Sequence, residues 1–311
     1  MRSIVFMGTP DFAVPALEAL IKHSDYDVKL VVSQTDKPQG RKQVMTPPPV
    51  KALALQHGIE IYQPVTLKTE EAYNKIASCE PDFIVVSAYG KILPPAILKI
   101  PAFGCVNLHG SLLPKYRGAA PIQWSVINGE KFSGVTTMLM DEGIDTGDIL
   151  LKEEKEIAPD ETAGELFDAL AALCPELLIK TLKGLEAGAI VPEKQDEAKA
   201  SYTTMLTKEM SVIDWSLGAH TICNLIRGLN PWPVAKTAYC NKALKIYAGA
   251  VSDKKSNGTA GKLFSEKNRI FVYCGENSVL ELLELQLEGS KRMSAAAFLL
   301  GHPLNDNIIL G

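Results

Sequence analysis

The densest run of chemically useful side chains in this 311-residue sequence lies between positions 107 and 118 and reads NLHGSLLPKYRG. Residues 105–108 have the apolar composition of a buried strand, which predicts that Asn107 and His109 project to the same side, since alternate strand residues share a face. An amide donor and an imidazole then face one space. In an open α/β sheet, ligands bind at the carboxyl ends of the strands.

A second polar segment, residues 141–148 (DEGIDTGD), follows the apolar run 135–139. Glycines on both sides of residues 144–146 allow a tight turn, which makes Asp145 the best-placed carboxylate. An amide, an imidazole and a carboxylate suit acyl transfer to an amine: the amide stabilises an oxyanion, the histidine moves a proton and the carboxylate orients the histidine. On this pattern alone, a hydrogen-bonded structural histidine beside an ordinary turn is the more common case. Ser111 lacks the sequence context of an activated nucleophile.

The elements that must position these residues alternate between strand and helix. Short apolar runs predict strands at residues 3–7, 28–32, 83–87 and 105–108, and helical spacing follows Gly8, covers 49–57 and resumes from Glu165. This order predicts an α/β, Rossmann-like, doubly wound parallel sheet. Only Gly8 of a dinucleotide fingerprint is present, so nicotinamide binding is not expected.

The composition and the expected secondary structure change in the second half of the sequence. Residues 192–200 (PEKQDEAKA) are polar and charged, and short strand-like runs follow at 236–239, 244–247, 269–273 and 279–287. Ser216 is a candidate cap for the helix that precedes them. We therefore expect a catalytic domain at 1–190, a linker at 191–207 and a small antiparallel, OB-like β-barrel at 208–311.

Composition limits the classes of protein to consider. With 46% apolar and 22% charged residues the chain is globular, and its apolar runs are too short to span a membrane. No secretory segment or metal-ligand spacing is present, so we expect a cytoplasmic protein with reduced cysteines and no metal. The net charge of −4 divides into −7 up to Thr207 and +3 after it.

The two polar segments, Asn107–Pro114 with Tyr116–Gly118 and then residues 141–148, closely resemble the core of the 10-formyltetrahydrofolate-dependent formyltransferases. Segments 8–13, 35–50, 119–123, 213–216 and 230–233 are similar to the branch of that family that acts on methionyl-tRNA, and the resemblance covers essentially the whole chain. It implies that Asn107, His109 and Asp145 are catalytic.

The resemblance also implies binding sites. The tetrahydrofolate site would be formed by Ser111, Leu112, Leu113 and Pro114 together with Val86, Tyr89 and Gly90. Residues 33–51 carry a local excess of three positive charges and four prolines. They resemble the family's tRNA-contacting insertion, with Lys37, Arg41 and Lys42 as the candidate contacts. Basic residues after Lys208 are further candidates, although a solvated surface explains them about as well.

The implied reaction moves the formyl group of 10-formyltetrahydrofolate to the α-amino group of initiator methionyl-tRNA for translation initiation. A monomer is expected. Three alternatives remain open: a formyltransferase acting on a small amine (a sugar nucleotide or glycinamide ribonucleotide), a folate-dependent formyl hydrolase, and a folate- or RNA-binding protein without catalysis. The basic insertion and the appended barrel favour tRNA over a small amine, and the intact trio argues against lost catalysis.

Overall fold

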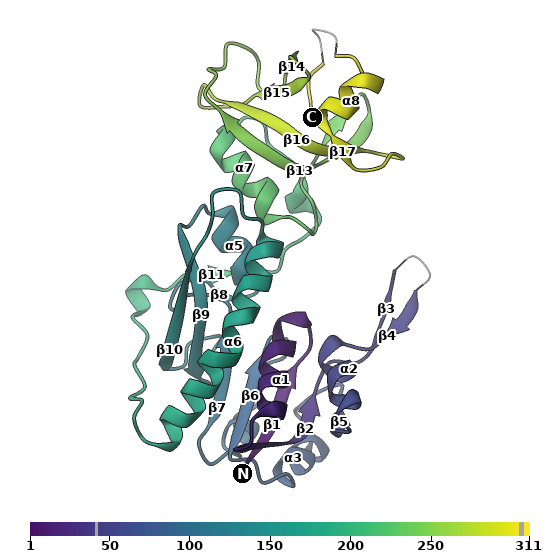
Figure 1. Cartoon of the computed structure of the whole chain (residues 1–311). Coiled ribbons are helices and arrows are strands. Elements are labelled where there is room, and N and C mark those ends of the chain that lie inside the picture. The colour runs from purple at the N-terminus through teal and green to yellow at the C-terminus, as the bar shows by residue number, and fades with distance from the viewer. Residues whose placement is uncertain (41–42, 305–307) are drawn as a thin grey trace. The chain divides into compact units, whose positions relative to one another are not determined.

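The structure is a computed structural model that describes residues 1–40, 43–304 and 308–311. The chain forms two compact units. The first unit contains Met1–Gly118, Ser133–Lys155 and Phe167–Thr203, and the second contains Ala119–Phe132, Glu156–Leu166 and the described residues from Thr204 onward. Each unit is described separately (Figure 1).

A seven-stranded sheet forms the centre of the first unit, in the order β10-β9-β7-β6-β1-β2-β5. Its strands are β1 (Arg2–Gly8), β2 (Tyr26–Val32), β5 (Ile61–Tyr62), β6 (Phe83–Ser87), β7 (Cys105–His109), β9 (Phe132–Leu139) and β10 (Ile149–Glu156). The pairs from β5 through β2, β1 and β6 to β7 are parallel, whereas β9 runs antiparallel to β7. The predicted Rossmann-like sheet is confirmed, but it is mixed rather than wholly parallel.

Helices cover both faces of this sheet. They are α1 (Val14–Lys22), α2 (Pro49–Gln56), α3 (Glu70–Ala77), α4 (Pro95–Leu98) and α6 (Ala163–Glu186), with short 3₁₀ turns at Asp11–Ala13 and Glu197–Lys199. Figure 1 shows α1 and α6 side by side on one face, where Phe12 and Phe167 meet with ring centroids 5.4 Å apart. The neighbouring β1 residues Val5 and Phe6 are both fully buried, because each points into a different helical layer.

Two small sheets complete the first unit. Strand β3 (Lys37–Gln39) pairs antiparallel with β4 (Val44–Thr46), and β8 (Arg117–Gly118) pairs in parallel with β11 (Tyr202–Thr203). The second pair matters for the site, because it joins the last two residues of the polar segment to residues of the predicted linker. In the described part of the chain, no helix has the length and apolar character needed to cross a membrane.

The second unit is built around a six-stranded antiparallel sheet in the order β12-β13-β16-β15-β14, with β17 beside β16. Its elements are α5 (Pro121–Ile127), a 3₁₀ turn (Glu209–Ser211), α7 (Ala219–Gly228), β12 (Lys236–Tyr239), β13 (Lys242–Ser252), β14 (Leu263–Glu266), β15 (Arg269–Tyr273), β16 (Val279–Leu287), β17 (Met293–Ser294) and α8 (Ala295–Gly301). Trp215, Ile222, Leu285 and Phe298 belong to its core. The predicted C-terminal antiparallel β unit is confirmed. Helix α7 follows Gly218, not the predicted cap Ser216.

Two segments from the middle of the sequence belong to the second unit. Helix α5 packs against α7, and the Arg227 guanidinium donates a 3.2 Å hydrogen bond to the carbonyl of Glu161. Because residues 119–132 and 156–166 associate in this way, no single cut in the chain separates the two units.

Candidate active site

The structure brings Asn107, His109 and Asp145 together in the first unit. Strand β7 presents Asn107 and His109 on one side, and both side chains are buried. Asp145 lies in the turn between β9 and β10. Its Oδ1 accepts a 3.4 Å hydrogen bond from Asn107 Nδ2, and its Oδ2 is 3.6 Å from His109 Nδ1. One carboxylate therefore contacts the other two members of the trio.

The turn that carries Asp145 is tightly folded. Asp145 has a left-handed backbone conformation (φ 54°), which is unfavourable for a residue with a side chain. A Cβ added at Gly147 would lie 1.7 Å from the carbonyl oxygen of Leu139, so only glycine fits there. The backbone N–H of Gly118 donates to Asp145 Oδ2 at 2.8 Å. The predicted role of glycine in this turn is confirmed at Gly147.

His109 has a second contact on the other side of its ring. Its Nε2 is 2.8 Å from the carbonyl oxygen of Tyr116, and because a carbonyl only accepts, Nε2 is the donor. The Nε2 hydrogen is thus held by Tyr116, while Nδ1 faces the Asp145 carboxylate at 3.6 Å, which is longer than a hydrogen bond. Ser111 is almost fully buried and donates its hydroxyl to the carbonyl of Lys115 at 2.7 Å. The Ser111 hydroxyl therefore contacts a backbone carbonyl rather than a general base that could activate it.

The two segments expected to bind folate border the trio. In the β6–β7 pairing Val86 lies opposite Asn107, and the backbone then passes through buried Tyr89 to Gly90. Gly90 has φ 79°, and a Cβ there would lie 2.5 Å from Gln34 Nε2. Residues 111–114 directly follow His109. These positions are those expected for a pocket wall, and their contact with folate stays a prediction.

Thr136 of β9 fixes the loop of residues 111–114. Its hydroxyl donates to the carbonyl of Ser111 at 2.6 Å and accepts from the N–H of Leu113 at 3.1 Å. Leu113 is buried in a small cluster with Met138 and Ile149. Leu112 and Pro114 remain partly exposed, so they are the better candidates for contact with a flat ring.

The residues that sequence reasoning missed are Arg117, Gln195 and Glu197. The side chain of Arg117 is fully buried and binds Gln195, Glu197 and the hydroxyl of Tyr202. The hydrogen bonds to Glu197 raise the pKa of the Arg117 guanidinium, and the same contacts lower the pKa of the Glu197 carboxyl. Gln195 and Glu197 lie in the segment predicted as a linker. No local sequence signal distinguishes them from solvated linker residues.

The predicted tRNA-contacting insertion forms the β3–β4 hairpin rather than an irregular loop. Lys37 lies on β3 and donates to Gln34 Oε1 at 3.1 Å, while Arg41 and Lys42 lie outside the described residues. Val44 and Met45 on β4 are exposed at 59% and 60%. Among the basic residues of the second unit, Lys254, Arg269 and Arg292 are ion-paired with glutamates.

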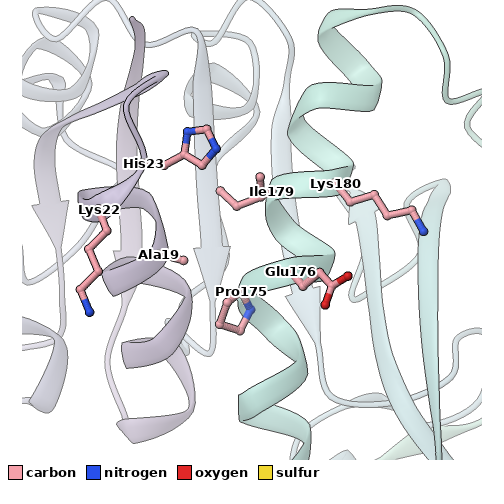
Figure 2. Close-up of a pocket in the computed structure, with 7 residues that line it drawn as sticks. All are labelled: Ala19, Lys22, His23, Pro175, Glu176, Ile179 and Lys180. Atoms are coloured by element: carbon pink, nitrogen blue, oxygen red, sulfur yellow. The ribbon is translucent and has the colours of Figure 1, made fainter.

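A separate open groove of about 600 Å³ lies between α1 and α6 (Figure 2). Ala19, Pro175 and Ile179 give it an apolar character, and the remaining lining residues are Lys22, His23, Glu176 and Lys180. None of them belongs to the trio or to the predicted folate segments. Within the described residues, no group of three or more histidine, cysteine, aspartate or glutamate side chains is arranged to hold a metal ion.

The two family models that match the chain follow one another in the sequence, whereas the two compact units interleave. Residues 1–182 match the family model described as formyl transferase, and residues 205–303 match the formyl transferase C-terminal domain. The methionyl-tRNA formyltransferase of Caldanaerobacter subterraneus is 50% identical over 308 residues, which cover 99% of each chain. The protein of that name from Trichlorobacter lovleyi is also 50% identical, over 97% of this chain and 94% of its own.

The chain belongs to the methionyl-tRNA formyltransferase family. Solved structures agree with the family's fold. The sugar 3N-formyl transferase WlaRD, determined with dTDP and 5-N-formyl-tetrahydrofolate, has a TM-score of 0.69 at 20% identity and covers 94% of this chain and 99% of its own. An N-formyltransferase from Helicobacter canadensis has a TM-score of 0.68 at 18% identity, covering 91% and 99%. At these identities the likeness concerns the fold alone.

Proposed function

We propose that this protein transfers the formyl group of 10-formyltetrahydrofolate to the α-amino group of methionyl-tRNA and so supplies formylmethionyl-tRNA for translation initiation. The observation that carries the proposal is the convergence of Asn107, His109 and Asp145 at the carboxyl end of β7, in a chain that matches methionyl-tRNA formyltransferases over nearly its full length. The cytoplasmic location and the monomeric state of the protein remain predictions.

The reaction begins when the neutral α-amino nitrogen of the methionyl ester attacks the formyl carbon on N10 of the folate. The carbonyl oxygen takes up the electron pair of the C=O bond, and the Asn107 amide, which has a second N–H besides the one bound to Asp145, donates to this oxyanion. When the C–O double bond re-forms, the bond from carbon to N10 breaks. Because the Nε2–H of His109 is held by the Tyr116 carbonyl, Nδ1 is the ring nitrogen that takes the proton lost by the amine and passes it to N10.

Asp145 interacts with both His109 and Asn107 in this mechanism. Its carboxylate lies beside His109 Nδ1 and stabilises positive charge on the ring while the histidine holds the proton. Its other oxygen holds the Asn107 amide by one N–H and leaves the second free. Folate would lie against Leu112 and Pro114 on one side and Val86 to Gly90 on the other. Val86 lies opposite Asn107 in the sheet and residues 111–114 follow His109, so both segments border the trio.

The substrate assignment is tested by offering formyl-labelled 10-formyltetrahydrofolate with methionyl-tRNA and, in separate reactions, with a sugar-nucleotide amine, glycinamide ribonucleotide or water alone. We expect label on methionyl-tRNA at least about 100-fold faster, per substrate concentration, than on either small amine, a margin that corresponds to roughly 3 kcal/mol. Label found only on a small amine, or formate released without any acceptor, would show that the tRNA assignment is wrong.

The charged hairpin predicts a specific salt dependence. Phosphate contacts release counterions, so the affinity for tRNA should fall steeply with salt. Replacing Lys37, Arg41 and Lys42 with alanine should reduce the slope of log affinity against log salt concentration by roughly 0.7 to 0.9 per lost phosphate contact. Filter binding from 50 to 300 mM salt measures this slope.

The matched control replaces three exposed lysines of the same unit, Lys68, Lys99 and Lys194, and removes the same net charge. We expect its slope to stay at the wild-type value and the KM for folate to be unchanged in both variants. An equal loss of slope in the two variants would mean that total charge, not the hairpin, determines tRNA binding.

A further inference from the structure

A chain of hydrogen bonds connects the predicted linker with the turn that carries Asp145. The side-chain amide of Gln195 donates to the carbonyl oxygens of Asp145, at 2.8 Å, and Gly147, at 2.7 Å. Both N–H donors of the amide are thereby used. Because the two carbonyls lie on either side of Thr146, Gln195 ties the turn together at its centre.

Arg117 determines which way the Gln195 amide points. Its Nε donates to Gln195 Oε1 at 3.0 Å, which commits the amide oxygen to Arg117 and directs the NH₂ group at the turn. The other guanidinium nitrogens bind both carboxylate oxygens of Glu197, at 2.7 and 2.9 Å, and the Tyr202 hydroxyl at 2.8 Å. A planar, fully buried guanidinium with these partners has little freedom to rotate.

Besides Gln195, the Asp145 turn is held by the Gly118 N–H on Asp145 Oδ2, at 2.8 Å, and by the Gly143 N–H and the Thr146 hydroxyl, which both donate to Asp141 within the turn. Its residues 141–144 are exposed, including Ile144 at 54%, and Asp145 itself has the left-handed φ of 54°. The contacts of Asp145 with Asn107 and His109 are long, at 3.4 and 3.6 Å, so a small displacement of the turn would break them. The hydrogen bonds from the Gln195 amide to the backbone carbonyls of Asp145 and Gly147 oppose such a displacement.

We propose that Gln195, oriented by Arg117 and Glu197, is a positioning residue that holds the Asp145 carboxylate against His109 and Asn107 during formyl transfer. Gln195 touches neither substrate in this scheme and acts only through the turn. The proposal rests on the proposed function, since it concerns the rate of that reaction. It assigns a role to a segment that lies beyond residue 182, where the match to the N-terminal family model ends.

The first test compares Gln195→Glu, which keeps the length of the side chain but points an oxygen at two carbonyls, with the control Glu193→Ala. Glu193 is exposed in the same segment. We expect Gln195→Glu to lower kcat roughly 30- to 100-fold, the scale of a misplacement of about 1 Å, with KM for both substrates within about twofold. Glu193→Ala should keep the wild-type kcat. An unchanged kcat in a folded Gln195→Glu variant would overturn the proposal.

The second test asks whether Gln195 acts through Asp145. In an Asp145→Ala background the position of the turn no longer matters, so Gln195→Ala should lower kcat by less than about twofold there, although it lowers kcat strongly in the wild-type background. Equal losses in the two backgrounds would mean a general structural role and would refute the proposal. Thermal unfolding of each variant reports any loss of stability separately.

A spectroscopic readout follows the position of the Asp145 turn directly. The NMR signals of the His109 ring should move in Gln195→Glu toward their positions in Asp145→Ala, and they should not move in Glu193→Ala. If Gln195→Glu does not fold, the same comparison is made with Glu197→Gln, which changes the exposed partner of Arg117. A smaller shift of the His109 signals in the same direction is then expected. The absence of any shift would contradict the proposal. Wild-type turnover tests the proposed function independently of these ratios.

Discussion

Replacement of His109 with alanine is expected to lower kcat for formyl transfer by roughly 10²- to 10⁴-fold, the range for loss of a general acid–base group. The amine must lose a proton and N10 must gain one, and His109 is the titratable side chain that the structure places between the Asp145 carboxylate and the Tyr116 carbonyl. Because this step follows binding, KM for both substrates should change by less than about threefold. Single-turnover assays with labelled formyl donor measure the loss.

The control for this prediction is His57→Ala, which removes an exposed histidine at the end of α2 and should leave kcat unchanged. Removing the His109 ring also leaves a small buried cavity, so thermal unfolding is measured in parallel. A folded His109→Ala variant with near-wild-type turnover would remove His109 from the mechanism.

Replacement of Asn107 with alanine is expected to lower kcat by roughly 10²- to 10³-fold, the cost of losing one oxyanion donor. The negative charge on the formyl oxygen exists only in the tetrahedral state, so the loss should fall on kcat rather than on KM. Asn107→Asp keeps the shape but replaces the donor with a carboxylate close to Asp145, where the amide nitrogen now lies 3.4 Å from Oδ1. We expect this variant to be at least as slow as Asn107→Ala.

An exposed asparagine on α3 provides the control, because Asn74→Ala removes the same group from a solvated helix surface and should not alter kcat. Equal turnover for wild type and Asn107→Ala would mean that another donor stabilises the oxyanion. A rise in KM without a change in kcat would instead place Asn107 in ground-state binding.

The fold was predictable from sequence where a local pattern determines the element. The buried strands β1, β6 and β7 coincide with short apolar runs, because a strand covered by helices on both faces needs no polar alternation. The direction of β9 was not predictable. Its apolar run indicates a strand but carries no information on whether the chain has reversed before it, since that depends on the path of the connection from β7.

The candidate site was predictable to the same extent. The alternation of side chains along a strand predicted that Asn107 and His109 share a face, and the flanking glycines marked Asp145 as the carboxylate of a tight turn. Both signals are local properties of the sequence. Arg117 and Gln195 were not found, since composition predicts that arginine is solvated and that a polar, charged segment is a linker. Arg117 and Gln195 are 78 positions apart in the sequence. The spacing of residues within a short segment cannot predict a contact over that separation.

The β8–β11 pairing has a consequence for the synthesis of the protein. Ser201 receives the N–H of Tyr116 on its hydroxyl and the N–H of Arg117 on its carbonyl, at 2.9 and 2.8 Å. A nascent chain that has emerged from the ribosome only as far as residue 190 already contains the whole trio, yet it lacks Ser201 and Gln195. If Gln195 positions Asp145 as proposed, a nascent chain should acquire formyl-transfer activity only after residue 195 has emerged, 50 residues after Asp145.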